Sequence, residues 1–74
     1  MAVTHAQVLE KAIRSLGGTW DTARAAQTLR DAGRGDGDRR QQEKRARQAL
    51  RDSARSGLIE KTHPSRAIYR AHER

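Results

Sequence analysis

Arginine, lysine and glutamine recur between residues 40 and 55 at a spacing that brings them to one side of a helix. Successive helical residues turn by about 100°. No acid falls on this side, because Glu43 and Asp52 lie nearer its margins. An ordinary solvated helix mixes charges of both signs, so this face predicts contact with an anionic partner. Its members are Gln41, Lys44, Gln48, Arg51 and Arg55, flanked by Arg40 and Arg47.

The side chains of this helix have the chemistry of nucleic-acid recognition. A guanidinium forms two hydrogen bonds to a phosphate or to O6 and N7 of guanine, and a glutamine amide can do the same to adenine. Phosphate contacts hold a protein in register on a duplex, and contacts to base edges read its sequence. We assign base-edge contacts to Gln41, Lys44, Arg45 and Gln48, and phosphate contacts to Arg40, Arg47, Arg51 and Arg55.

Two other segments add donors to this set. Lys61, His63 and Arg66 surround a proline-containing turn, from which they could reach the backbone or the minor groove of a duplex. Thr22 and Arg24 stand at the expected start of a helix, where unsatisfied backbone N–H groups attract phosphate.

The charge is concentrated in the second half of the chain. The 74 residues carry 16 basic and 9 acidic side chains, a net charge of +7. Residues 1–37 hold 5 basic and 4 acidic groups, a net of +1, whereas residues 38–74 hold 11 basic and 5 acidic groups, a net of +6. The excess therefore coincides with the helix and the turn that carry the candidate contacts.

Composition excludes several classes of protein. Without cysteine there is no disulfide framework and no thiolate zinc site, and the three histidines lie in different elements, so we expect no metal and no cofactor. A chain this short buries too thin a core for a deep substrate cavity. No nucleophile, base and orienting group occur at a suitable spacing, so we expect no enzyme.

The sequence also lacks the signals of a membrane or secreted protein. No stretch approaches the roughly 20 apolar residues of a membrane span. The amino terminus lacks the basic-then-apolar order of a signal peptide. We therefore expect no membrane contact and a cytoplasmic, nucleoid-associated location.

An apolar stripe predicts the first helix. Val8, Leu9, Ala12, Ile13 and Leu16 fall on one side of a helical projection. A threonine and a glutamine three residues apart predict a capping box at its start, and a pair of glycines predicts its end.

The remaining pattern predicts a mainly α fold with a small β-hairpin, in one domain spanning residues 1–74. Asp21 or Thr22 can cap a second helix and Asp38 a third. After Gly57 the apolar period becomes that of two strands around a turn, and Trp20 offers a third short strand. The expected elements are helices at about 4–16, 22–32 and 39–56, a short strand at 19–20, a mobile glycine-rich loop at 33–38 and a hairpin at 58–70.

The carboxy-terminal segment ALRDSARSGLIEKTHPSRAIYRA, residues 49–71, resembles the winged helix-turn-helix family. In that family the third helix leads through a glycine-leucine-isoleucine exit into a hairpin, the wing, as Leu50 leads to residues 57–59 here. The resemblance implies three helices with a two- or three-stranded wing, and DNA contact through the third, recognition helix and the wing. It places Ala46, Ala49 and Leu50 in the core of the recognition helix, residues 63–66 at the wing tip and Trp20 in the short first strand.

Charge clustering and the resemblance point to one surface. The sequence therefore predicts binding of double-stranded DNA, with the recognition helix in the major groove and additional wing contacts. A small transcriptional regulator or a plasmid- or phage-type accessory factor would act by occupying a site, and a homodimer would occupy a longer, palindromic one. The alternative is a protein-interaction module of the same fold that docks an acidic partner. RNA or single-stranded DNA would call for more exposed aromatic residues than this chain has.

Overall fold

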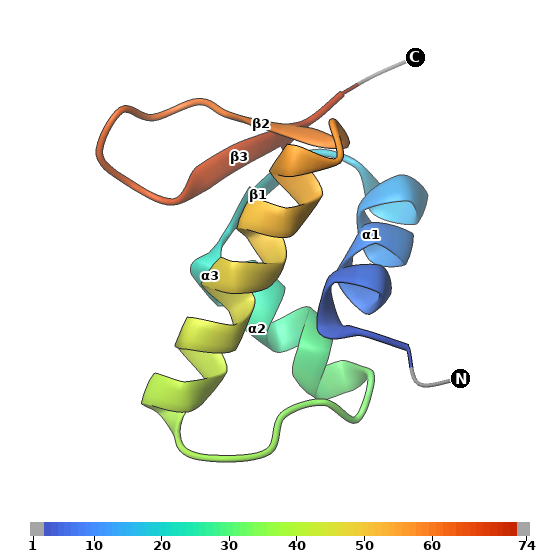
Figure 1. The fold of residues 1–74 in the computed structure, drawn as a ribbon, viewed down its shortest axis with the longest axis vertical. Coiled ribbons are helices and arrows are strands. Elements are labelled where there is room, and N and C mark those ends of the chain that lie inside the picture. Colours follow the sequence, from blue (N-terminus) through green and yellow to red (C-terminus); the bar gives the residue numbers. More distant parts are fainter. Residues whose placement is uncertain (1–2, 73–74) are drawn as a thin grey trace.

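Three helices and three short strands follow one another along residues 3–72, the part of the chain that the computed structural model describes (Figure 1). Their bounds are α1 His5–Leu16, β1 Thr19–Asp21, α2 Thr22–Asp31, α3 Arg39–Arg55, β2 Ile59–Lys61 and β3 Ile68–Ala71. The mainly α fold with a small sheet confirms the fold class predicted from the sequence. The helices α2 and α3 each end one residue earlier than predicted, and β1 is one residue longer.

The first helix begins with the capping box that the sequence predicts. The Gln7 backbone N–H donates to Thr4 Oγ1 over 3.1 Å, and the Thr4 backbone N–H donates to Gln7 Oε1 over 2.9 Å. Two of the four unpaired N–H groups at this helix end are thereby satisfied.

The apolar stripe of α1 is buried except at its last member. Leu9 and Ile13 lie in the core, and Val8 and Ala12 pack against it. Leu16, in contrast, is 66% exposed. It shares the side of α1 that carries Leu9, but as the last helical residue it lines an open depression beside Leu58 and Ala71.

The strands form one antiparallel sheet in the order β1-β3-β2. Trp20 of β1 lies opposite Tyr69 of β3, and Tyr69 lies opposite Lys61 of β2. The short strand that the sequence places at Trp20 therefore joins the hairpin as its third strand. This pairing ties the segment after α1 to the carboxy-terminal part of the described chain.

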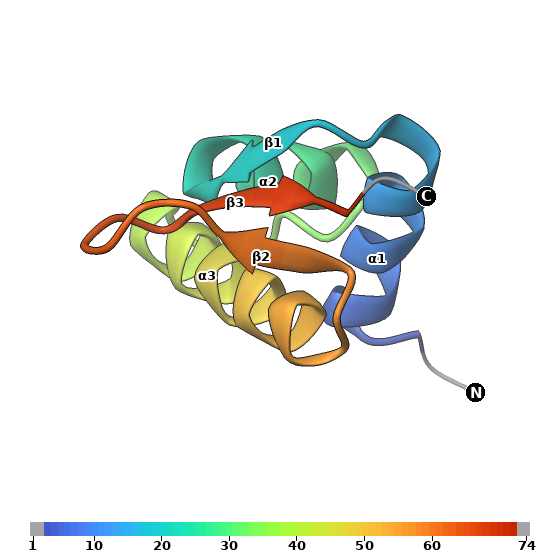
Figure 2. The same cartoon turned by 90° about the horizontal axis from the view of Figure 1, so that it is seen from above.

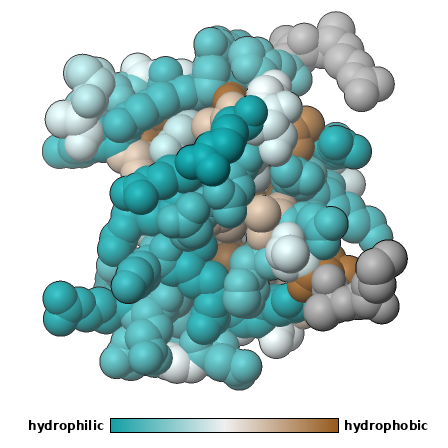
Figure 3. All heavy atoms as spheres, viewed as in Figure 1, coloured by the Kyte–Doolittle hydropathy of each residue, from teal (hydrophilic) through white to brown (hydrophobic). Residues whose placement is uncertain are grey.

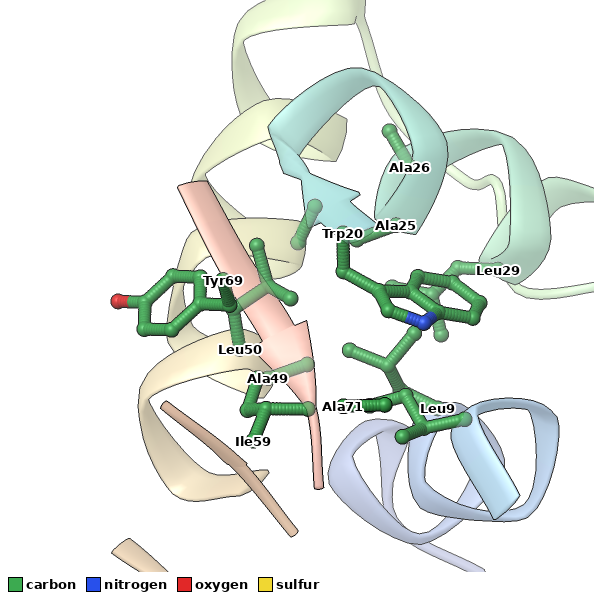
Figure 4. Close-up of a cluster of buried hydrophobic side chains, with 12 residues drawn as sticks. Leu9, Trp20, Ala25, Ala26, Leu29, Ala49, Leu50, Ile59, Tyr69 and Ala71 are labelled. Atoms are coloured by element: carbon green, nitrogen blue, oxygen red, sulfur yellow. The ribbon is translucent and has the colours of Figure 1, made fainter. Parts of the chain in front are cut away.

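The core is small and centres on Trp20 (Figure 4). Trp20, Leu9, Leu29, Leu50 and Ile59 are its largest fully buried apolar side chains, and they come from α1, α2, α3 and the sheet. Trp20 is the only tryptophan and the chain has no phenylalanine, so one indole supplies much of the buried volume. Buried alanines on α2 and α3 complete the cluster, namely Ala25, Ala26, Ala46 and Ala49.

The glycine-rich loop between α2 and α3 is fastened to α3. Gln42 Nε2 donates to the carbonyls of Gly35 and Gly37 over 2.8 and 2.9 Å, and Arg45 Nη1 donates to the carbonyl of Arg34 over 2.7 Å. The loop is therefore held at three carbonyls, where the sequence predicts a mobile segment.

The hairpin projects beyond the helices. Figures 1 and 2 both place the loop between β2 and β3 on the side of the molecule where α3 lies, away from α1. Three helices followed by such a hairpin form a winged-helix arrangement. None of the helices in residues 3–72 combines the length and the apolar composition needed to cross a membrane.

Candidate nucleic-acid interface

The outward face of α3 carries most of the predicted contact residues. Five of them line one shallow depression on the surface and are exposed, so the helical spacing brings together the side chains that the sequence predicts. Figure 3 shows this side of the molecule covered largely by hydrophilic side chains. The residues that line the depression are Arg40, Lys44, Arg47, Gln48 and Arg51.

Little of this positive charge is neutralised by the protein itself. Within residues 3–72, ion pairs form at Glu43 alone, which lies 3.1 Å from Arg39 Nε and 4.0 Å from Arg47 Nη1. Both pairs are exposed and span one helical turn, so each contributes only a few tenths of a kcal/mol, roughly 0.3–0.5. The cations of Arg40 and Lys44 have no acidic partner within that range among the described residues.

The two glutamines of the face already make hydrogen bonds within the protein. Gln41 Oε1 accepts from the Asp38 backbone N–H over 3.1 Å, and Asp38 Oδ1 accepts from the Gln41 N–H over 2.9 Å, which completes a capping box at the start of α3. Gln48 Nε2 donates to Asp52 Oδ1 over 3.1 Å. A bidentate contact to adenine needs one lone pair of the amide oxygen and one N–H of the amino group. Each of these glutamines keeps a second lone pair or a second N–H for that contact.

Arg45 shares a second depression with Gln41, Lys44 and Gln48, so the four predicted base-edge residues lie together. It is half-buried, its guanidinium donates to the carbonyl of Arg34, and it lines a groove between α1 and α3 that also includes His5. Arg45 thus holds the loop before α3 with one N–H of its guanidinium, and its predicted contact to a base edge stays a prediction.

The start of α2 carries two further predicted contact residues, Thr22 and Arg24, and both are half-buried. Asp21 caps the helix by accepting from the Arg24 backbone N–H over 2.8 Å, and Thr22 is half-buried as the first helical residue. The guanidinium of Arg24 turns back over Trp20, with its central carbon 4.0 Å from the ring centroid. Trp20 lies in β1, before the cap of α2, so the helical i,i+4 rule does not apply to this pair and the charge pattern of the sequence gives no sign of the contact.

The wing presents two cations and one turn-forming histidine. Lys61 and Arg66 are exposed, as a contact role requires. His63 is half-buried, and its Nδ1 accepts from the backbone N–H groups of Ser65 and Arg66 over 3.2 and 3.1 Å. His63 thereby closes the wing tip through Nδ1 and has its other ring nitrogen left for a ligand.

His5 stands in the groove between α1 and α3. Burial, together with the charges of Arg45 and Arg34, lowers the pKa of His5 below its ordinary value of 6.5, while Asp36 opposes the shift. A neutral imidazole is therefore favoured at this end of α1. No group of three or more metal-ligating side chains occurs in residues 3–72.

The chemistry available on the α3 face and the wing is that of cations and hydrogen-bond donors around shallow surface depressions. Such a surface can bind an extended anion by its shape and charge, and its predominance of arginine suits phosphate in particular. No family model, curated protein or solved structure matches the chain.

Proposed function

We propose that the chain binds double-stranded DNA, with α3 in the major groove and the wing beside it, as a member of the winged helix-turn-helix family. The acid-free row of cations and glutamines on the outward face of α3 carries the proposal. A helix fits the major groove of B-form DNA, which is about 12 Å wide, and its outward side chains then face base edges and phosphates.

The position of the wing supports the same orientation. The hairpin projects on the side of α3, so a duplex lying along α3 passes near Lys61 and Arg66 (Figures 1 and 2). A small binder of this kind acts by occupying its site, as a transcriptional regulator or an accessory factor in replication or excision.

Fluorescence anisotropy with a labelled duplex at several salt concentrations tests the proposal. We expect the affinity to fall steeply with salt, and the slope of log K against log salt to decrease by about 1 for each phosphate contact removed. The variants Arg40→Gln and Arg51→Gln should each show this decrease. The matched control is Arg14→Gln, which removes the same charge from the exposed surface of α1 and should leave the slope nearly unchanged.

The same measurement distinguishes the proposed function from the alternative function. Equal effects of all three substitutions would show that net charge, and not the α3 face, attracts the duplex. Weak binding of the duplex, with an affinity that does not depend on salt, would instead favour the module that docks an acidic protein partner.

A further inference from the structure

A row of three side chains crosses the sheet from the core to the surface. Trp20 lies opposite Tyr69, and Tyr69 lies opposite Lys61. Directly opposed residues of antiparallel strands place their side chains on the same face, with Cβ atoms about 4.5–5.5 Å apart. Because Trp20 is fully buried against the helices and Lys61 is exposed, this row lies on the inner face of the sheet and ends at its solvent-exposed edge.

The hydroxyl of Tyr69 is a hydrogen-bond donor that the protein does not use. The residue is only 6% exposed, yet its hydroxyl has no hydrogen-bond partner among the described residues. No buried side-chain oxygen or nitrogen of those residues lacks a partner, so the hydroxyl must reach the surface. Figure 4 agrees, because the ring of Tyr69 points away from the other labelled side chains with its oxygen outermost.

The surface beside Tyr69 is the one that the duplex would face. In Figure 3 the outline of the molecule is indented between the wing and the lower half of α3. Lys61, opposite Tyr69, has no acidic partner within 4.0 Å in residues 3–72. Two directly opposed residues of this kind bring an ammonium group and a phenolic hydroxyl within reach of a single anion, one as a charge and the other as a neutral donor.

We infer that Lys61 and Tyr69 together bind one backbone phosphate of the duplex, at the base of the wing. The inference rests on the proposed function and adds to it a residue that the charge pattern of the sequence does not reveal. Lys61 supplies the charge of this site, while the buried ring of Tyr69 fixes the position of the second donor.

The neighbouring pair on the same strands provides a control. Glu60 lies opposite Arg70, and strand alternation places this pair on the outer face of the sheet. Arg70→Gln therefore removes one positive charge from the wing at a position adjacent to Tyr69, but on the face that the duplex does not meet.

Anisotropy with the labelled duplex tests the site through Tyr69→Phe, Lys61→Gln, the double variant and Arg70→Gln. Tyr69→Phe should weaken binding about 10- to 150-fold, the range of a hydrogen bond to a charged group, with an unchanged salt slope because no charge is lost. Lys61→Gln should weaken binding and lower the salt slope by about 1. The double variant should lose less than the product of the two single losses, because both donors serve one phosphate.

Several outcomes would overturn the site while leaving the proposed function intact. In the first, the wild type binds with salt-dependent affinity and Tyr69→Phe binds equally well. In the second, Arg70→Gln loses as much affinity as Lys61→Gln. A lower Tm of Tyr69→Phe would also overturn it, since the loss would then belong to the fold. A wild type without salt-dependent duplex binding would reject the proposed function itself, and the phosphate site with it.

Discussion

The guanidinium of Arg24 covers the indole ring of Trp20, the largest side chain of the core, at 4.0 Å from its centroid. Its Nη1 also donates to the carbonyls of Thr19 and Gly17 over 2.7 and 3.3 Å. The indole Nε1–H donates to the same Gly17 carbonyl over 3.0 Å. One cation therefore joins α2 to the turn after α1 and covers the ring between them.

Substitution of Arg24 should lower the stability of the fold. Arg24→Gln loses the contact with the indole and both carbonyl bonds, and we expect a loss of about 1–2 kcal/mol in the free energy of unfolding. Arg24→Lys keeps the charge but not the planar, forked group, so it should restore only part of this loss. Thermal denaturation followed by circular dichroism measures both. A lysine variant as stable as the wild type would show that the charge alone matters.

The outward face of α3 was predictable because a helix of 17 residues repeats its 3.6-residue period several times. The short strand at Trp20 was predictable for another reason, because it lies between the glycine pair that ends one helix and the cap that begins the next. The exposure of Leu16 was not predictable, because the apolar period places it with Leu9 but carries no information on how completely each member of the stripe is covered.

The roles of Arg24 and Arg45 could not be derived from charge patterning. Each guanidinium binds backbone carbonyls, and every residue has a carbonyl, so the partner leaves no mark in the sequence. Tyr69 is a similar case, since only the three-dimensional arrangement shows that its hydroxyl lacks a partner among residues 3–72.

The capping box of α3 should contribute to the stability of the fold. Asp38→Ala removes the acceptor for the Gln41 N–H and should lower the free energy of unfolding by about 1 kcal/mol. Asp38→Asn removes the same charge but keeps an oxygen acceptor, so it is the matched control. Denaturation and duplex binding of both variants separate the cap from the charge. Equal stability of the two variants would contradict a role for the cap.

Alanine should be tolerated less well at Gly37 than at Gly57. Both glycines have positive φ, 92° and 84°, a conformation that costs an alanine roughly 1–2 kcal/mol. At Gly57 a new Cβ would meet no atom within 4 Å, whereas at Gly37 it would collide with Oε1 of Gln41, the acceptor of the capping box. We expect Gly37→Ala to show the larger drop in Tm. The opposite order would show that the start of α3 adjusts without cost.

Stability should decline on acidification, in part because of His5. Its pKa is lowered in the folded state by burial and by Arg45 and Arg34, against the opposing charge of Asp36, so the unfolded chain binds the proton more readily. As the pH falls below about 6.5, protonation therefore favours unfolding, and the penalty grows until the folded state is protonated too. The variant His5→Gln does not titrate and should lose less stability than the wild type between about pH 7 and pH 5. Urea denaturation of both proteins across this range isolates the contribution of His5, because the other titrating groups are common to both. Parallel curves would mean that the imidazole has the same proton affinity in the folded and unfolded chain.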